Sequence, residues 1–317
     1  MKVCVIKTSS MGDVIHTLPA LTDAQRAIPN LSIDWVVEEN FAEIPRWYSA
    51  VNRVIPIALR RWRKSPFSIQ TRNEWKNYRT LLQAENYDAV IDAQGLFKSA
   101  FFATRLANGI KHGYDRKSIR EPIASFFYDK KYAISYQQHA VERIRQLFSQ
   151  ALSYPLPKGK GDYDIARHFI SVDAIKPYVL FFHATTRDEK HWPEREWRNL
   201  IEKLTALSIQ VRLPWGNEKE KARAERLATG LSHVVVLPKL SLTELAYQIA
   251  NAKAVVSVDT GLAHLTAALD KPNITLYGAT DPKLIGCYGK NQHYLSASSM
   301  ENIKSDQVFS MLNLLIK

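Results

Sequence analysis

Two clusters of polar residues in the second half of the chain have the types and positions needed to bind a diphosphate. In SVDTGLAHLTAAL (257–269), Asp259, Thr260 and Gly261 stand between an apolar run typical of a buried strand and a predicted helix. The free N–H groups and the dipole of a first helical turn favour a phosphate, and His264 lies about one turn further on. The alternative is an ordinary helix cap beside a buried histidine, which this motif alone favours because such caps are common.

The second cluster is FFHATTRDEKHWP (181–193), which also follows an apolar run. Its Thr185 and Thr186 hydroxyls and its Lys190 ammonium suit the oxygens of a diphosphate or a ribose. A third stretch, LPWGNEKEKARAE (213–225), offers Glu220 to ribose hydroxyls, as acids do in nucleotide-binding sheets. The alternatives are a solvated polar loop and an acidic helix start, and the latter is the better interpretation of Glu218.

Near the N-terminus, KTSSMGDVIHTLP (7–19) breaks from a run of β-formers into small residues and then a helix. Lys7, Ser10 and Gly12 would make an anion-binding loop, yet the residue at the helix start is itself an acid, Asp13. In isolation Asp13 is best interpreted as a helix-start acid that complements the dipole. The stretch matches neither the dinucleotide fingerprint nor the phosphate loop of nucleotide hydrolases, so NAD and ATP-hydrolysis functions lose support.

A basic stretch, IALRRWRKSPF (57–67), combines four cations with the apolar residues Trp62 and Phe67. Arginine binds phosphate and carboxylate through two hydrogen bonds, and the aromatic residues suit a lipid headgroup or a nucleic-acid strand. The alternative is a solvated basic loop. The cations are Arg60, Arg61, Arg63 and Lys64; Lys98, Arg120 and His139 are candidates to extend the patch.

Apolar runs alternate with helical periodicity along most of the chain, which is typical of parallel sheets covered by helices. Predicted strands are 3–6, 33–37, 89–93, 178–182, 209–213, 233–237, 254–258 and 273–277. Predicted helices are 13–27, 140–152, 194–207, 218–229, 241–251, where Ser241 and Glu244 form a capping box, and 261–269. A linker rich in proline, glycine and lysine, LSYPLPKGKGDYD (152–164), separates two such α/β units.

Charge is unevenly distributed along the 317 residues, whose net charge is +12. Residues 1–153 hold 22 lysines and arginines against 14 acids, so this half favours an anionic partner. Two cysteines exclude a disulfide framework, and we predict a reduced compartment, no signal peptide and no membrane span. Asp162 and Asp164 have the spacing of a metal-binding pair of carboxylates. They lie in the linker, however, so no metal site is predicted.

These stretches together resemble the ADP-heptose-using glycosyltransferases of family 9. The resemblance is strongest in KTSSMGDVIHTLPALTDAQ, LRRWRK, NYDAVIDAQGLFKSA, HATTRDEKHWP and SVDTGLAHLTAALDKPNITLYG. It implies a GT-B fold, in which two Rossmann-like domains face each other across a cleft. Residues 1–153 would form the acceptor-binding domain, 154–164 the linker and 165–317 the nucleotide-sugar-binding domain, with a last helix that can pack back on the first domain.

The resemblance also implies the reaction. The enzyme would transfer heptose, with inversion and without metal or cofactor, from ADP-L-glycero-β-D-manno-heptose to the Kdo of Kdo2-lipid A. An alternative acceptor is the mono-heptosylated product of that reaction. The implied protein is a cytoplasmic monomer, peripheral on the inner membrane, that binds no nucleic acid. There are two rival hypotheses. One is a nucleic-acid-binding protein, which the basic N-terminal half supports, and the other is a nucleotide-binding protein without catalysis.

The resemblance implies roles for individual residues as well. Asp13 would be the catalytic base, and Leu240, where the family commonly has methionine, would contact adenine. The remaining donor-binding residues would be Thr185, Thr186, Lys190, Glu220, Asp259, Thr260, Gly261 and His264. The acceptor-binding residues would be Lys7, Ser10, Gly12, Arg60, Arg61, Arg63, Lys64, Gln94, Lys98, Arg120 and His139.

Overall fold

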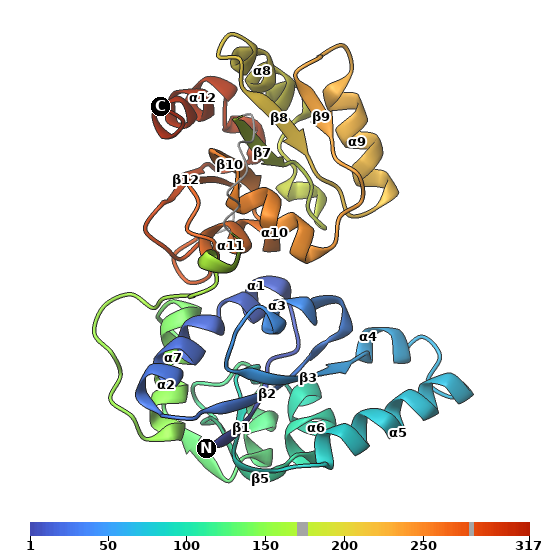
Figure 1. Ribbon diagram of the computed structural model, residues 1–317, viewed down its shortest axis with the longest axis vertical. Coiled ribbons are helices and arrows are strands. Elements are labelled where there is room, and N and C mark those ends of the chain that lie inside the picture. The colour runs from blue at the N-terminus through green and yellow to red at the C-terminus, as the bar shows by residue number, and fades with distance from the viewer. Residues whose placement is uncertain (170–176, 279–281) are drawn as a thin grey trace. The chain divides into compact units, whose positions relative to one another are not determined.

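The computed structural model describes residues 1–169, 177–278 and 282–317. The chain divides into two compact units, Met1–Asp164 and Ile165–Lys317, drawn in blue to green and in green to red in Figure 1. Each unit is built on its own six-stranded, all-parallel sheet. Among the described residues, no helix is both long enough and apolar enough to cross a membrane.

The sheet of the first unit has the strand order β3-β2-β1-β4-β5-β6. Its strands are β1 (Lys2–Ile6), β2 (Ser32–Glu38), β3 (Val51–Ile57), β4 (Asn86–Asp92), β5 (Asn108–Tyr114) and β6 (Lys130–Tyr132). The strand order reverses at β1, which pairs with β2 on one side and with β4 on the other. Such a reversal opens a crevice at the carboxyl ends of the two strands, where parallel sheets bind ligands.

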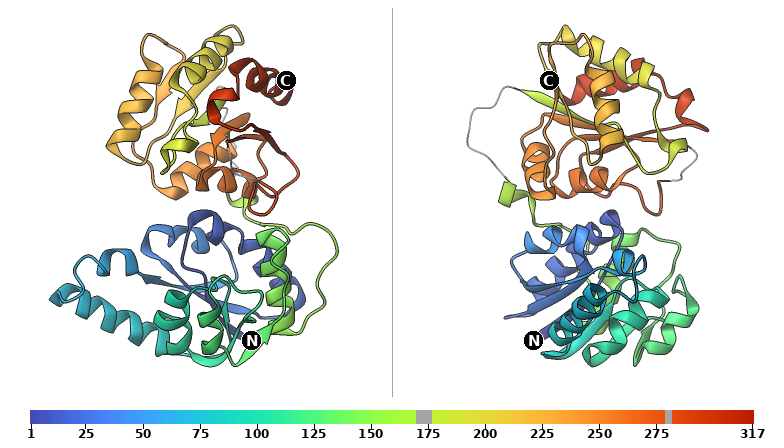
Figure 2. Two further views of the ribbon diagram at one scale, coloured as in Figure 1. Left: turned by 180° about the vertical axis from the view of Figure 1, so that it is seen from behind. Right: turned by 90° about the vertical axis from the view of Figure 1, so that its right-hand side faces the viewer.

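Helices cover both faces of this sheet. They are α1 (Met11–Ile15), α2 (Leu18–Ala27), α3 (Glu43–Arg46), α4 (Leu59–Trp62), α5 (Ile69–Gln83), α6 (Phe97–Phe102) and α7 (Ala140–Leu152), with short 3₁₀ turns η1 (Glu39–Phe41), η2 (Thr104–Leu106) and η3 (Pro122–Phe127). Helices α2 and α7 pack together, whereas α5 and α6 lie on the other side of the sheet (Figures 1 and 2). Right-handed crossovers account for this division. The chain moves along the sheet in one direction from β1 to β3, and then crosses back to β4 and continues in the opposite direction to β6.

The single helix predicted over 13–27 is wrong, because the structure has two helices there. Helix α1 ends at Ile15, and α2 begins at Leu18 with Pro19 in its first turn. Proline has no N–H to donate and its ring clashes with the carbonyl four residues earlier, here that of Ile15. The break leaves α1 as a short turn that presents Asp13 at the end of β1.

The linker is held onto the first unit by arginine. Buried Arg145 of α7 pairs with Asp23 at 2.6 Å and donates to the carbonyl oxygens of Pro157 and Gly159. Arg26 pairs with Asp162 at 2.7 Å, so this carboxylate of the DYD stretch is neutralised by a guanidinium.

The sheet of the second unit has the order β12-β11-β10-β7-β8-β9. Its strands are β7 (Tyr178–Phe182), β8 (Gln210–Leu213), β9 (Val234–Val236), β10 (Ala254–Val258), β11 (Asn273–Tyr277) and β12 (Gln292–Ser296). Its helices are α8 (Glu194–Thr205), α9 (Glu218–Ala228), α10 (Leu242–Ala250), α11 (Gly261–Ala268) and α12 (Ser305–Leu315), with η4 (Ala166–Phe169), η5 (Asp188–Lys190) and η6 (Met300–Asn302). Here the order reverses between β7 and β10.

The core of the second unit forms between this sheet and helices α8, α9 and α12. Trp192, Trp197 and Phe181 are buried in it, and Val308 and Leu312 of α12 belong to the same cluster. The last helix therefore packs against α8 within its own unit. The predicted capping box of α10 is confirmed, since Ser241 and Glu244 each accept from the other's backbone N–H.

Candidate functional site

The loop after β1 holds Asp13 at the carboxyl edge of the first sheet. Ser10 is the N-cap residue of α1, and its N–H and hydroxyl donate to Asp13 Oδ2 at 2.9 and 3.1 Å. Gly12 is buried beneath the loop, whereas the Asp13 side chain is 44% exposed. Asp13 thus caps the helix through Oδ2 while its side chain stays partly exposed, and both a purely structural acid and a catalytic base could be placed in this way.

Lys7 lies under this loop and supplies a positive charge. Its Nζ is 3.7 Å from Asp13 Oδ1 and donates to the Ala93 carbonyl oxygen at 2.9 Å. Burial lowers the pKa of Lys7, and the negative charge of Asp13 opposes that effect. The pair places a lysine next to the partly exposed Asp13 carboxylate.

Gln94 and Asp92, at the end of β4, shape the loop from below. Gln94 Oε1 accepts from the N–H groups of Thr8 and Ser9 at 2.9 and 3.0 Å. Asp92 is fully buried and accepts from the N–H groups of Gln94 and Gly95, and burial raises its pKa. Gln94, predicted to contact an acceptor, therefore positions the Asp13 loop in this structure. Sequence reasoning missed Asp92 as a supporting residue, although its place at the end of a strand was a usable signal.

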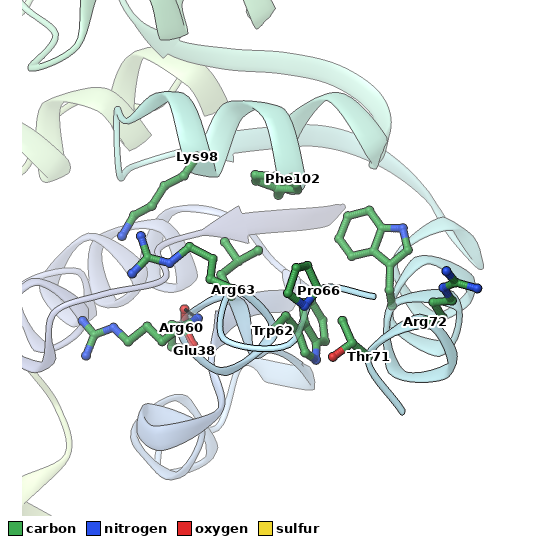
Figure 3. A pocket seen from close by; sticks show the side chains of 11 residues that line it. Glu38, Arg60, Trp62, Arg63, Pro66, Thr71, Arg72, Lys98 and Phe102 are labelled. Carbon is green, nitrogen blue, oxygen red and sulfur yellow. Dashed lines mark hydrogen bonds between the residues drawn. The ribbon is translucent and has the colours of Figure 1, made fainter. Parts of the chain in front are cut away.

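A pocket of about 400 Å³ lies between α4, α5 and α6 (Figure 3). One part of its wall is apolar and the other is basic. The apolar residues are Leu59, Trp62, Pro66, Trp75 and Phe102; the cations are Arg60, Arg63, Arg72 and Lys98. Figure 3 shows the side chains of Arg63 and Lys98 on one side of the pocket, with Phe102 and Pro66 further along. This volume falls within the range of about 300–1,000 Å³ usual for ligand pockets.

The pocket is connected to the Asp13 loop. Lys98 Nζ donates to Ser9 Oγ at 3.4 Å, next to the capping residue Ser10. Glu38 is buried at the pocket wall, where it accepts from the Arg60 N–H at 3.3 Å, and burial raises its pKa. Sequence reasoning missed Glu38 as well, although it ends β2 just as Asp92 ends β4.

The structure separates the other predicted acceptor cations from this pocket. Arg61 pairs with Glu39 at 2.9 Å and with Glu74 at 2.8 Å, so its guanidinium is held by two acids. Lys64 and Arg120 are exposed. His139 caps α7, its Nδ1 accepting from the Val141 N–H, and its ring meets that of His16 edge-on at 5.3 Å.

Arg143 of α7 is a further cation that the sequence analysis did not single out. Its guanidinium lies over the rings of Tyr114 at 4.8 Å and Tyr136 at 4.2 Å, and it donates to the Ser118 carbonyl oxygen. Its charge contributes to the lowered pKa of Lys7, so Arg143 lies near the Asp13 loop. Helical periodicity gave no signal for it, because the same helix carries a second arginine, Arg145.

In the second unit, the reversal between β7 and β10 brings together the two predicted phosphate-binding loops. Lys190, after β7, forms an ion pair with Asp259, after β10. Thr185 Oγ1 donates to the Asp259 carbonyl oxygen at 3.1 Å, and the Thr185 N–H donates to His191 Nε2. The structure thus joins three predicted donor residues into one cluster at the carboxyl edge of the sheet.

Helix α11 begins beside this cluster. Thr260 is its N-cap residue, but the Thr260 hydroxyl makes no capping hydrogen bond, and Gly261 is the first helical residue. First-turn N–H groups without a side-chain cap are suited to an anion. His264 lies one turn on and is 9% exposed.

The other predicted donor residues lie in neighbouring loops. Glu220 accepts from the Gly216 N–H and from the side-chain amide of Asn217, both at 2.7 Å, while Asn217 caps α9. Thr186 is exposed and Leu240 is half-buried. Glu220 therefore has a structural role in the start of α9 that the sequence analysis had assigned to Glu218.

His183, at the end of β7, should make the second unit sensitive to acid. Burial, with a further contribution from Arg223, lowers the pKa of His183 to about 4 from its ordinary 6.5. Between these pH values the unfolded chain binds a proton that the folded chain does not, so stability falls as pH falls, by roughly 3 kcal/mol in all. We expect His183→Gln to reduce the pH dependence of the unfolding free energy between pH 6.5 and 4. The exposed His293→Gln is the control, and an equal change in both variants would contradict the assignment.

Within residues 1–169, 177–278 and 282–317, no group of three or more histidine, cysteine, aspartate or glutamate side chains is arranged to hold a metal ion.

The chain is similar to known proteins of one family. Residues 75–313 match the model of glycosyltransferase family 9 (heptosyltransferase). The chain is 59% identical over 318 residues to lipopolysaccharide heptosyltransferase 1 of Escherichia coli, covering 99% of each chain. It is 24% identical to lipopolysaccharide heptosyltransferase 2 of the same organism, covering 89% of this chain and 84% of that protein.

Two solved structures are also similar to this chain over nearly its whole length. E. coli heptosyltransferase WaaC with ADP matches with a TM-score of 0.97 and 57% identity, covering 99% of this chain and 100% of that one. WaaC with ADP-2-deoxy-2-fluoro heptose matches with a TM-score of 0.94 and 56% identity, covering 99% of both. The predicted GT-B type of fold, two α/β domains with parallel sheets, is confirmed. The chain therefore belongs to glycosyltransferase family 9, the heptosyltransferases.

Proposed function

We propose that this enzyme transfers L-glycero-D-manno-heptose from ADP-heptose to the Kdo of Kdo2-lipid A. The observation that carries the proposal is the near full-length similarity to lipopolysaccharide heptosyltransferase 1, at 59% identity. The similarity to WaaC, whose structure was solved with an ADP-heptose analogue, supports the donor. The activity of heptosyltransferase 2 is the second candidate, and the 24% identity to it makes it the weaker one.

The donor binds in the second unit in this proposal. The first-turn N–H groups of α11 and the ammonium of Lys190 face the diphosphate, where positive charge stabilises the departing ADP. Asp259 holds Lys190 before the donor arrives and then contacts the sugar or its linkage. Thr185, Thr186, Gly261, His264, Glu220 and Leu240 complete the donor site around the phosphates, the ribose and the adenine.

The chemical step is a direct displacement with inversion. The Kdo hydroxyl oxygen forms a bond to the anomeric carbon while the bond from that carbon to the diphosphate oxygen breaks, releasing ADP. The Asp13 carboxylate accepts the hydroxyl proton, and the Lys7 ammonium lies 3.7 Å from Asp13 Oδ1. A carboxylate suffices as base because the hydroxyl becomes acidic only as the new bond forms.

The acceptor binds in the first unit. Its phosphates and carboxylates are anions, and the pocket cations Arg60, Arg63 and Lys98 stand next to the loop that carries Asp13. Charge supports this division, because residues 1–153 are the more basic half. We further propose that the reaction needs no metal and that the enzyme works as a monomer on the cytoplasmic face of the inner membrane, in a domain arrangement of 1–153, 154–164 and 165–317.

Arg60 and Arg63 line the pocket, whereas Arg61 is paired with two acids, so the proposal assigns acceptor binding to Arg60 and Arg63. We expect the double variant Arg60→Ala, Arg63→Ala to raise the KM for Kdo2-lipid A by about tenfold or more per lost contact, with the KM for ADP-heptose nearly unchanged. The control is Arg61→Ala, since Arg61 is held by Glu39 and Glu74 and should change the acceptor KM less. Steady-state kinetics with each substrate varied checks this, and equal effects on both KM values would argue against the pocket.

The choice of acceptor is tested by competition. Purified enzyme, ADP-heptose and equal amounts of Kdo2-lipid A and its mono-heptosylated product are incubated together, and products are resolved by mass. We expect heptose on Kdo2-lipid A; preferential use of the mono-heptosylated acceptor would favour the alternative function.

A further inference from the structure

We propose that the first unit docks on an anionic lipid bilayer through a docking rim formed by Phe67, Ile69, Phe97, Ile123 and Phe126. These residues come from the α4–α5 connection, the start of α5, the start of α6 and η3. The inference rests on the proposed function, whose acceptor is carried by a lipid, and it goes further by naming the surface that meets the membrane.

The rim exposes large apolar side chains to solvent. Phe67 is 81% exposed, Ile69 77%, Phe126 72%, Ile123 54% and Phe97 38%. Single exposed apolar residues are ordinary, but several on one rim, surrounded by polar residues, mark a surface that another body covers. Phenylalanine is a residue that interfacial segments insert at the boundary between headgroups and acyl chains.

Sheet topology places the segments that carry these residues on one face of the sheet. Helices α5 and α6 and turn η3 are the successive connections from β3 to β4, β5 and β6, so right-handed crossovers put all three on the same face. Their N-terminal ends follow the carboxyl ends of strands, which is the edge where Asp13 lies. Figures 1 and 2 both show α5 and α6 on one side of the sheet.

Aromatic contacts join α5, α6 and η3 to one another. The Trp75 ring of α5 meets the Phe102 ring of α6 at 5.8 Å, and the Phe97 ring of α6 meets the Phe127 ring of η3 at 6.0 Å. Helix α6 is therefore packed between α5 and η3. The rim residues stand on a continuous packed layer and do not depend on separate loops.

The charges around the rim are those that an anionic membrane attracts. Residues 57–72 contain five arginines and lysines and no acid, and of these Arg61 is paired with Glu39 and Glu74 from outside the stretch. Beside η3, Arg116, Lys117 and Arg120 are exposed, and the neighbouring Glu121 carboxylate already accepts from the Phe97 N–H at 2.7 Å. Cations at a membrane surface are drawn to anionic headgroups, and each adds to the attraction.

A bilayer fits this combination better than a second copy of the chain does. Two copies meeting through the rim would bring these cations together, and like charges oppose such contact. The pocket beside Arg63 and Lys98 lies between α4 and α6, next to the rim. An acceptor whose acyl chains stay in the bilayer would then present its charged sugars to the pocket without leaving the membrane.

The test is sedimentation of the full-length enzyme with vesicles of phosphatidylethanolamine and phosphatidylglycerol. We expect the triple variant Phe67→Ser, Ile69→Ser, Phe126→Ser to bind about tenfold more weakly than the wild type, because exposed apolar groups supply the insertion energy. The matched control is Leu314→Ser in α12, whose side chain is 73% exposed in the other unit and should leave binding unchanged. The charge variant Arg116→Glu, Lys117→Glu should also weaken binding to these vesicles, and raised salt should weaken that of the wild type.

Two outcomes would overturn the inference. One is a triple variant that sediments with vesicles like the wild type. The other is a wild type that forms a dimer which the triple variant cannot form, with equal vesicle binding by both. Heptose transfer to a water-soluble, deacylated form of Kdo2-lipid A is measured separately: we expect the triple variant to match the wild type there. Absence of that transfer in the wild type would refute the proposed function, while the vesicle result alone decides the docking rim.

Discussion

Replacing Asp13 with asparagine is expected to lower kcat for heptose transfer by about 100-fold or more, the usual contribution of a positioned base. Asparagine keeps a side-chain oxygen that can accept from the Ser10 N–H and hydroxyl, the two contacts by which Asp13 Oδ2 caps α1. It cannot take the proton of the Kdo hydroxyl. The variant therefore separates the capping role of Asp13 from its role as base.

The measurement is kcat with saturating donor and acceptor, together with the melting temperature and ADP binding of the same preparation. Asp13→Ala, which loses both roles, serves as the companion variant and should show a comparable loss of kcat with some loss of stability. If Asp13→Asn turned over at near the wild-type rate, Asp13 would be only a helix cap, and the base would have to be sought elsewhere.

Lys190→Met is expected to have an effect of similar size, lowering kcat by about 100-fold, as the loss of one group that stabilises developing charge usually does. Lys190 pairs with Asp259 beside the start of α11, and in the proposed function its ammonium faces the diphosphate as that group gains negative charge. Removing it also leaves Asp259 unpaired next to the diphosphate, which adds repulsion to the lost attraction.

A lysine from an ordinary surface pair provides the control for this variant. Lys203 of α8 lies 2.8 Å from Asp306 in the same unit, and Lys203→Met should leave kcat unchanged. Kinetics with ADP-heptose varied distinguishes the two roles open to Lys190. A rise in the donor KM with kcat preserved would mean that Lys190 binds the ground state only and does not assist departure of ADP.

The interior of the fold follows closely from the sequence. The strands at 178–182, 254–258 and 273–277 have the predicted bounds, because strands buried on both faces read as continuous apolar runs. Helix 140–152 was also predicted with its observed ends. The positions of the site loops follow from these strands, since parallel sheets gather chemistry at their carboxyl ends.

Two strands at the edges of the sheets escaped prediction. Strands β6 (KKY) and β12 (QHYLS) are largely exposed or half-buried and carry polar residues, so no apolar run marks them. Their existence depends on pairing with β5 and β11, which is a tertiary effect. The break in the helix at 13–27 could have been predicted from Pro19.

Side-chain partners were the least predictable part of the site. The sequence indicates that Arg61 belongs to a basic stretch, but the acids that hold it, Glu39 and Glu74, lie 22 and 13 residues away. Gln94 likewise reaches the Asp13 loop across 86 residues, at Thr8. Such pairings depend on how the chain folds back, so spacing along the sequence identifies candidates without saying which of them remain available to a ligand.

Heptose transfer itself is tested by a single incubation of purified enzyme with ADP-heptose and Kdo2-lipid A, followed by mass spectrometry of the lipid. We expect a product heavier than the acceptor by one heptose residue, formed together with ADP and absent when Asp13→Asn replaces the wild type over the same brief incubation. An unmodified acceptor after prolonged incubation of the wild-type enzyme would show that the enzyme does not catalyse this transfer.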